Sequence, residues 1–104
     1  MNLAKERVYR FGYFLPKTGG AFLQELHGEI KSLSRALKAD SVEVSVKRTL
    51  PPDPHKTAGL LSRITTTDYD GVAILAPDSP QVRDAVTRIK ERRVHVVRLI
   101  SGAD

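Results

Sequence analysis

The sequence predicts an α/β fold built on a parallel sheet, and three observations predict it. Segments with the helical period of apolar residues alternate with short segments that are apolar on both faces or at every second position. One short segment, "VAILA" at 72–76, is entirely apolar, which is typical of a strand covered on both faces. Breaks containing glycine or proline lie between each of the first three predicted strands and the helix that follows it. The resulting order β-α-β-α-β-α-β requires crossover connections and therefore a parallel sheet.

The first half of the chain contains a predicted strand, helix and strand. "VYRFGYFL" at 8–15 has apolar or aromatic residues on both faces, which favours a buried strand. "VEVSVKRTL" at 42–50 alternates with a period of two, which predicts an edge strand with one solvated face. Between them, the apolar residues recur every three or four positions and predict one buried stripe on a helix over 21–38: Phe22, Leu26, Ile30, Leu33 and Leu37.

The second half opens with "PPDPH" at 51–55, which breaks regular structure because proline has no backbone N–H. Asp53 is a predicted N-cap, with Pro54 in the first turn of a helix that runs to about residue 64. Ser79 is the predicted cap of a third helix, which follows the strand "VAILA". "VHVVRLI" at 94–100 is the predicted fourth strand.

The favoured spatial order of the four strands is 2-1-3-4, in a three-layer arrangement. Right-handed crossovers then place the first helix on one face of the sheet and the other two on the opposite face. No helix is left to cover strands 3 and 4 on the side of the first helix. Because both strands are apolar, we expect this face to be buried by another part of the protein or by a partner, such as a second copy.

Composition and charge exclude several classes of protein. The 104 residues suffice for one small domain, and the absence of cysteine excludes disulfides, thiolate metal sites and thiol catalysis. No apolar run approaches the ~18 residues that span a membrane, and "MNLAKERVYR" has no signal-peptide core, so a cytoplasmic location is expected. The net charge is +5. The densest basic group, "RIKERR" at 88–93, is either a solvated helix end or a surface for nucleic acid or another anionic partner.

Ligands of open α/β sheets bind beyond the carboxyl ends of the strands, where the strand order reverses. For the order 2-1-3-4 this point lies between strands 1 and 3, so the loops at 16–21 and 76–80 are the candidate ligand site. Lys17 and Thr18 either contact an anion or are solvated, Phe22 is either core or a platform for a ligand, and Asp78 either binds a ligand hydroxyl or shapes the turn.

Motifs for catalysis and cofactor binding are missing from the sequence. Neither G-x-x-x-x-G-K-[ST] nor G-x-G-x-x-G occurs, and His27, His55 and His95 lack the spacing of metal ligands. No Ser-His-Asp set, carboxylate pair or G-x-S-x-G elbow is present. A phosphorylatable receiver domain is rejected because no carboxylate ends strand 1. We therefore expect a non-enzymatic protein without a metal ion or cofactor.

Three segments together resemble a known family: "VYRFGYFLP…AFLQELHGEI", "YDGVAILAPDSPQVRDAV" and "RRVHVVRLISGAD". They are similar to the effector-binding core of lac repressor family transcription regulators, whose fold is shared by periplasmic sugar-binding proteins. The resemblance implies that residues 8–104 are an incomplete N-terminal lobe of a type I periplasmic-binding-protein-like fold, and that residues 1–7 are a linker remnant. An alternative is a lobe of a periplasmic sugar-binding protein for uptake, and a third is a small flavodoxin-like enzyme or phosphate-binding domain.

The resemblance also implies a site and partners. A sugar or related metabolite would bind between two lobes, in a homodimer that reaches DNA only through a helix-turn-helix not found in this sequence, and no membrane is involved. Where sugar binders of the family often have Asn-Pro and two aromatics, this chain has Gly19-Gly20-Ala21-Phe22, which suits a bulkier or acidic ligand. The ligand contacts of the family fall on Lys17, Thr18, Gly19, Gly20, Ala21, Phe22, Pro77, Asp78, Ser79, Ser101 and Asp104.

Overall fold

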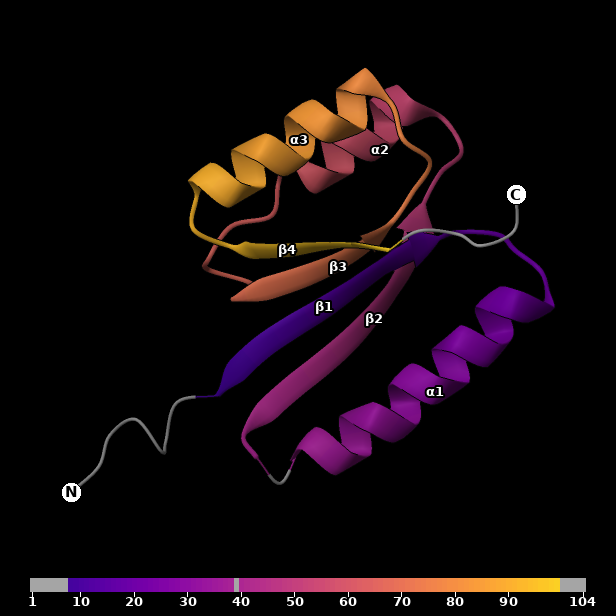
Figure 1. Ribbon diagram of the computed structural model, residues 1–104, viewed down its shortest axis with the longest axis vertical. Coiled ribbons are helices and arrows are strands. Elements are labelled where there is room, and N and C mark those ends of the chain that lie inside the picture. The colour runs from indigo at the N-terminus through magenta and orange to yellow at the C-terminus, as the bar shows by residue number, and fades with distance from the viewer. Residues whose placement is uncertain (1–7, 39, 100–104) are drawn as a thin grey trace.

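The structure is a computed structural model, and it describes residues 8–38 and 40–99. Its four strands form one parallel sheet in the order β2-β1-β3-β4, which confirms the predicted topology (Figure 1). The elements along the chain are β1 (Tyr9–Pro16), α1 (Ala21–Lys38), β2 (Val42–Leu50), α2 (Pro54–Leu61), β3 (Gly71–Leu75), α3 (Pro80–Glu91) and β4 (His95–Leu99). The second helix ends three residues earlier than the sequence predicts.

The helices form two outer layers around the sheet. Helix α1 packs on one face against β2, whereas α2 and α3 lie side by side on the other face (Figure 1). The larger cluster of buried side chains lies between the sheet and the α2–α3 layer and includes Leu61, Ile74 and Ile89. The smaller cluster lies under α1 and includes Leu23 and Ile30.

The buried face of α1 differs from the predicted stripe. Within that stripe Ile30 is buried and Leu26 and Leu37 are half-buried, whereas Phe22 and Leu33 are exposed. The other buried residue of the helix is Leu23, which the stripe did not include. Phe22, assigned more readily to the core by its spacing, keeps 54% of its surface exposed. Phe22 is exposed because of the lateral position of α1 on the sheet. The helix lies over the edge strand β2, so its flank toward β3 and β4 has no element opposite it.

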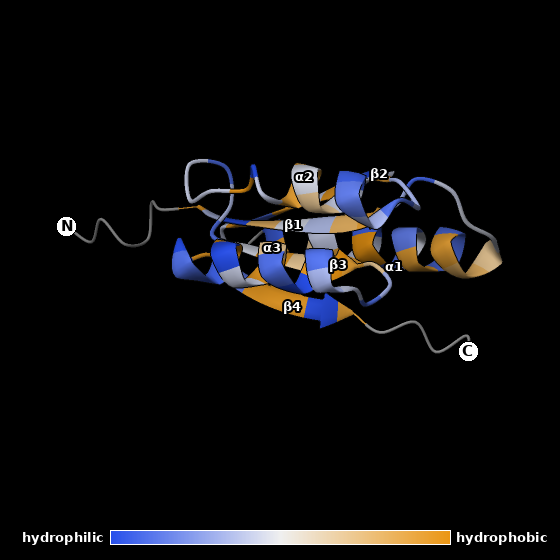
Figure 2. Cartoon of the chain, turned by 90° about the horizontal axis from the view of Figure 1, so that it is seen from above, coloured by the Kyte–Doolittle hydropathy of each residue, from blue (hydrophilic) through white to orange (hydrophobic). Residues whose placement is uncertain are grey.

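The uncovered face of the sheet is present as predicted. Among the described residues, no helix lies over β3 and β4 on the side of α1, and Val97 is 49% exposed there. Hydropathy colouring shows β4 as a largely apolar strand along the edge of the molecule (Figure 2). Further along this face, the rings of Phe11 and Tyr13 meet edge to face at 5.3 Å. A Cβ on Gly71 would lie 2.9 Å from the Phe11 ring, so a larger residue there requires the ring to shift.

Side-chain caps begin the two shorter helices, as predicted. The Asp53 carboxylate accepts hydrogen bonds from the backbone N–H groups of His55 at 2.8 Å and Lys56 at 3.4 Å. These two bonds, His55 first, lower the pKa of Asp53 below its ordinary value of 3.8. The cap therefore contributes its full stabilisation of α2 above that ordinary value and loses it as the pH falls through the lowered pKa.

The end of α3 has the hydrogen bonds of a Schellman motif. The Val94 N–H donates to the Ile89 carbonyl at 3.4 Å, and the Arg93 N–H donates to the Lys90 carbonyl at 2.9 Å. Arg93 occupies the position of the motif that glycine usually takes, with a left-handed φ of 70°. Its side chain is exposed. The left-handed backbone conformation at Arg93 therefore has a free-energy cost, because Arg93, unlike glycine, carries a Cβ atom.

The substitution Arg93→Gly is expected to raise the free energy of unfolding by about 0.5–1 kcal/mol, because glycine adopts the left-handed conformation without a Cβ clash. The measurement is urea denaturation followed by circular dichroism. Arg92→Gly is the control, since Arg92 has a φ of −84° and glycine there gives no such relief. Equal effects of the two substitutions would contradict the strain at Arg93.

Candidate functional site

The candidate site lies at the carboxyl edge of the sheet, between β1 and β3. These strands are neighbours, and the chain leaves β1 for the face that carries α1 but leaves β3 for the opposite face (Figure 1). The loops at 17–20 and 76–79 therefore diverge from adjacent strand ends. This arrangement is the topological switch point at which open α/β sheets bind ligands. The structure thus places the starts of the two loops that the sequence singled out at neighbouring strand ends, from which they run to opposite faces of the sheet.

In the first loop, Gly19 and Gly20 have different surroundings. A Cβ on Gly19 would lie 1.9 Å from Leu23 Cδ1, so glycine is required there because Leu23 packs against the loop. A Cβ on Gly20 would meet nothing within 4 Å. The Gly20 carbonyl accepts hydrogen bonds from the Leu23 and Gln24 N–H groups at 3.1 and 3.3 Å, which start α1. Packing therefore explains Gly19, whereas the backbone of Gly20 is open to approach.

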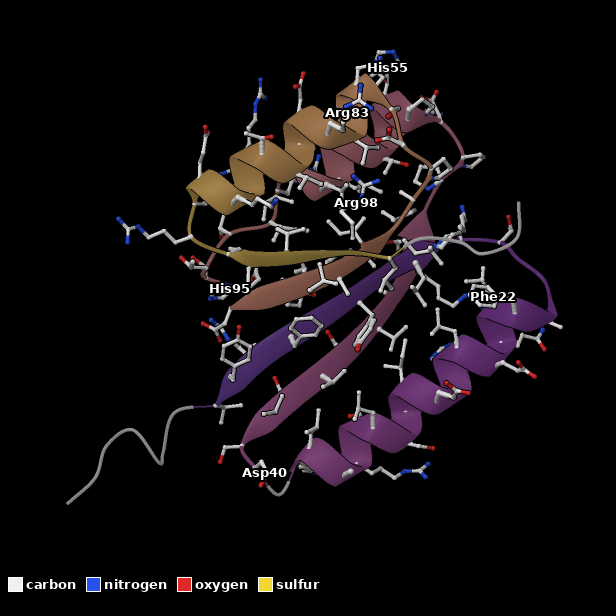
Figure 3. The ribbon with its side chains drawn as sticks, in the orientation of Figure 1. Phe22, Asp40, His55, Arg83, His95 and Arg98 are labelled. Atoms are coloured by element: carbon white, nitrogen blue, oxygen red, sulfur yellow. The ribbon has the colours of Figure 1, made fainter. Side chains whose placement is uncertain are left out.

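The remaining residues of this loop are exposed at the start of α1. The Lys17 N–H donates to the Leu50 carbonyl at 2.8 Å, which ties the loop to the end of β2. Lys17, Thr18, Ala21 and Phe22 are all exposed, and Phe22 is on the first turn of the helix (Figure 3). The first turn of an eighteen-residue helix leaves backbone N–H groups without intrahelical partners, which favours oxygen-rich or anionic groups nearby.

In the second loop, the two polar side chains have partners within the protein. The Ser79 hydroxyl accepts a hydrogen bond from the Val82 N–H at 3.1 Å and caps α3, as predicted. Asp78 forms an ion pair with Arg83 at 2.6 Å, and both side chains are exposed. Pro77 is exposed as well. Asp78 and Ser79 therefore shape the turn at the start of α3. The two other predicted contacts, Ser101 and Asp104, lie outside the described residues.

Two arginines at this edge were not singled out from the sequence. Arg98 on β4 donates from Nη2 to the carbonyl of Ala76 at 3.3 Å, and so reaches the second loop (Figure 3). Arg48, near the end of β2, pairs with Leu15 on the face that carries α1. The Nε atoms of both are buried and have no hydrogen-bond partner among the described residues. An arginine near the carboxyl end of each strand was the available signal.

The substitution Gly19→Ser is expected to lower the free energy of unfolding by about 1–3 kcal/mol, because its Cβ displaces the buried side chain of Leu23. The matched substitution Gly20→Ser places its Cβ in open space and supplies a good N-cap hydroxyl, so its effect is expected to stay within about 0.5 kcal/mol. Urea denaturation of both variants measures the difference. A loss at Gly20 as large as that at Gly19 would contradict this account.

The described part of the chain limits the other kinds of site. Within residues 8–38 and 40–99, no three His, Cys, Asp or Glu side chains come together as a metal site. None of the helices described is both long and apolar enough to cross a membrane. Comparison with known proteins gave no match to any family model, curated protein or solved structure. The lac repressor family therefore remains a hypothesis based on the residue pattern.

Proposed function

We propose that this chain is the ligand-sensing part of a transcription regulator of the lac repressor type and forms one wall of a small-metabolite cleft. The observation that carries the proposal is the switch point between β1 and β3, where Gly20 and Phe22 are exposed at the start of α1. The resemblance of the sequence to the effector-binding core of that family supports it.

The exposed groups indicate the chemistry of the ligand. The N-terminal turn of α1 and Lys17 favour an anionic group, and the open backbone at Gly20 lets a ligand approach closely. The half-exposed ring of Phe22 offers an apolar surface against which a sugar ring can pack. An acidic sugar, such as a sugar acid or sugar phosphate, combines these features.

Regulation in this proposal comes from closure of the cleft. A second lobe supplies the opposite wall, and closure changes the spacing of the DNA-binding heads of a dimer. The ligand shifts this equilibrium only by the difference between its affinities for the open and closed arrangements. One wall alone offers part of the contacts, so this chain by itself is expected to bind its ligand weakly.

The proposal is tested by nuclear magnetic resonance of the ¹⁵N-labelled chain, titrated with gluconate, glucose 6-phosphate and ribose at millimolar concentrations. We expect the two acidic compounds to shift the amide signals of Gly19–Phe22 and of Asp78 and Ser79, with ribose as the uncharged comparison. Absence of shifts at both loops with all three compounds would contradict a site for this ligand class.

A matched pair of variants separates binding from folding. Gly20→Asn places a side chain in the open space at the site, whereas Gly28→Asn places the same side chain in open space further along α1. The first is expected to weaken binding about tenfold, equivalent to ~1.4 kcal/mol, and the second to leave it unchanged. Equal weakening by both would contradict contact at Gly20.

A further inference from the structure

A second surface, remote from the switch point, runs along the seam between α1 and β2. A hollow of about 360 Å³ lies between Lys31, Ser34 and Arg35 of the helix and Val44 and Val46 of the strand. A second hollow, of about 380 Å³, also includes Ser34 and Val44 and extends to Lys38 and Val42. The two hollows share Ser34 and Val44 and therefore adjoin each other, and together they are termed here the α1–β2 groove.

The helix side of the α1–β2 groove is basic. His27, Lys31, Arg35 and Lys38 follow one another at intervals of four, four and three residues and lie on one flank of α1. Glu43, at the end near Lys38, is the one carboxylate that lines the two hollows. Among the described residues, Lys31, Arg35 and Lys38 form no ion pair. The positive charge of this flank is therefore not neutralised within the described part of the protein.

The strand side of the groove is the free edge of the sheet. Strand β2 lies at one end of the order β2-β1-β3-β4, with β1 on its inner side. The Tyr9 N–H donates to the Ser41 carbonyl at 2.9 Å, while Tyr9 is opposite Val42. In a parallel ladder the opposed residue turns its own N–H and C=O away from the neighbour. Val42, and by alternation Val44 and Val46, therefore present backbone hydrogen-bonding groups at the outer edge.

We propose that the α1–β2 groove binds an acidic peptide segment of a partner protein in an extended conformation, added as a fifth strand beside β2. The outward N–H and C=O groups of Val42, Val44 and Val46 pair with the peptide backbone. Acidic side chains at alternate peptide positions face Lys31 and Arg35, because alternate side chains of a strand share one face. The valine side chains and Ile30 form the apolar floor beneath them.

Two other occupants fit the groove less well. Single-stranded nucleic acid is usually held by aromatic side chains between the cations, and no aromatic residue lines either hollow. A second copy of this chain, paired edge to edge, brings two basic flanks together, and their like charges repel. An acidic strand matches both the free edge and the charge.

The test is fluorescence anisotropy at low salt, measured with the full 104-residue chain. The probe is a fluorescein-labelled, acetylated peptide that alternates glutamate and threonine. We expect saturable binding, weakened at least about tenfold, equivalent to ~1.4 kcal/mol, by the double substitution Lys31→Glu and Arg35→Glu. The control, Arg88→Glu with Lys90→Glu, reverses the same number of exposed charges on α3 and is expected to leave binding unchanged.

Further measurements distinguish the acidic peptide from the other occupants. The same peptide, N-methylated at alternate residues, keeps its charge but loses backbone donors, and is expected to bind at least about tenfold more weakly. Equal binding of the methylated peptide, or of an oligothymidylate of equal charge, would overturn the proposal. So would the absence of peptide binding, or a dimer in light scattering that the double substitution dissociates.

Discussion

Replacement of Leu61 by alanine is expected to lower the free energy of unfolding by about 2–5 kcal/mol, the largest effect of any substitution considered for this protein. Leu61 is the last residue of α2, has no exposed surface, and packs in the cluster between the sheet and the α2–α3 layer. The substitution removes buried apolar surface and leaves a cavity, because the neighbouring elements close the space only partly.

Leu60→Ala is the matched control, since the preceding residue of the same helix is 38% exposed. Its effect is expected to stay below about 1 kcal/mol. The measurement is urea denaturation followed by circular dichroism, with the slope of the transition compared between variants. A natural domain is stabilised by only about 5–15 kcal/mol, so Leu61→Ala is expected to shift the midpoint strongly. Similar losses for Leu60 and Leu61 would contradict the described packing of α2.

The second large effect is expected for Asp70→Ala, at about 2–3 kcal/mol of lost stability. The buried Asp70 carboxylate accepts a hydrogen bond from the Arg10 N–H at 2.9 Å and lies 3.5 Å from the Arg10 Nε. The guanidinium of Arg10 also donates to the carbonyls of Thr66 and Thr67, so one ion pair holds the turn before β3 against β1. Alanine removes the carboxylate oxygen that accepts the hydrogen bond from the Arg10 N–H.

Two variants make this prediction specific. Asp70→Asn keeps an oxygen that accepts from the Arg10 N–H and is expected to lose less stability than alanine. Asp78→Ala breaks an ion pair whose side chains are both exposed, and its cost is expected to be at most about 1 kcal/mol. Denaturation of the three variants measures the ranking. A cost for Asp78→Ala equal to that for Asp70→Ala would show that burial of the Asp70 carboxylate is unimportant.

Much of the candidate site follows from local sequence features. The caps at Asp53 and Ser79 were predictable because each needs only a hydrogen bond to the next turn of its own helix. The start of the loops at 17–20 and 76–79 from neighbouring strand ends followed from the strand order, which right-handed crossovers restrict strongly. That these loops bind a ligand stays a prediction, because no contact within the chain depends on a bound ligand.

Contacts between distant segments were not predictable in the same way. Leu23, rather than Phe22, is buried because α1 lies over β2, a choice made by packing between the helix and the sheet. The same placement leaves Phe22 exposed at the switch point and presents the basic flank of α1 beside the free edge of β2. The pairing of Arg98 with the Ala76 carbonyl spans 22 residues and has no local signature.

The sequence by itself determined the order of the elements, the parallel sheet, the helix caps and the uncovered face of β3 and β4. These features depend on the period of apolar residues, on turn residues and on the handedness of crossovers, which are properties of short segments. Only the tertiary structure decided which side of α1 is buried, why Gly19 must be glycine, and which cations line the α1–β2 groove. Each of these depends on where a rigid helix settles laterally on a sheet, and close packing of side chains from distant segments sets that position.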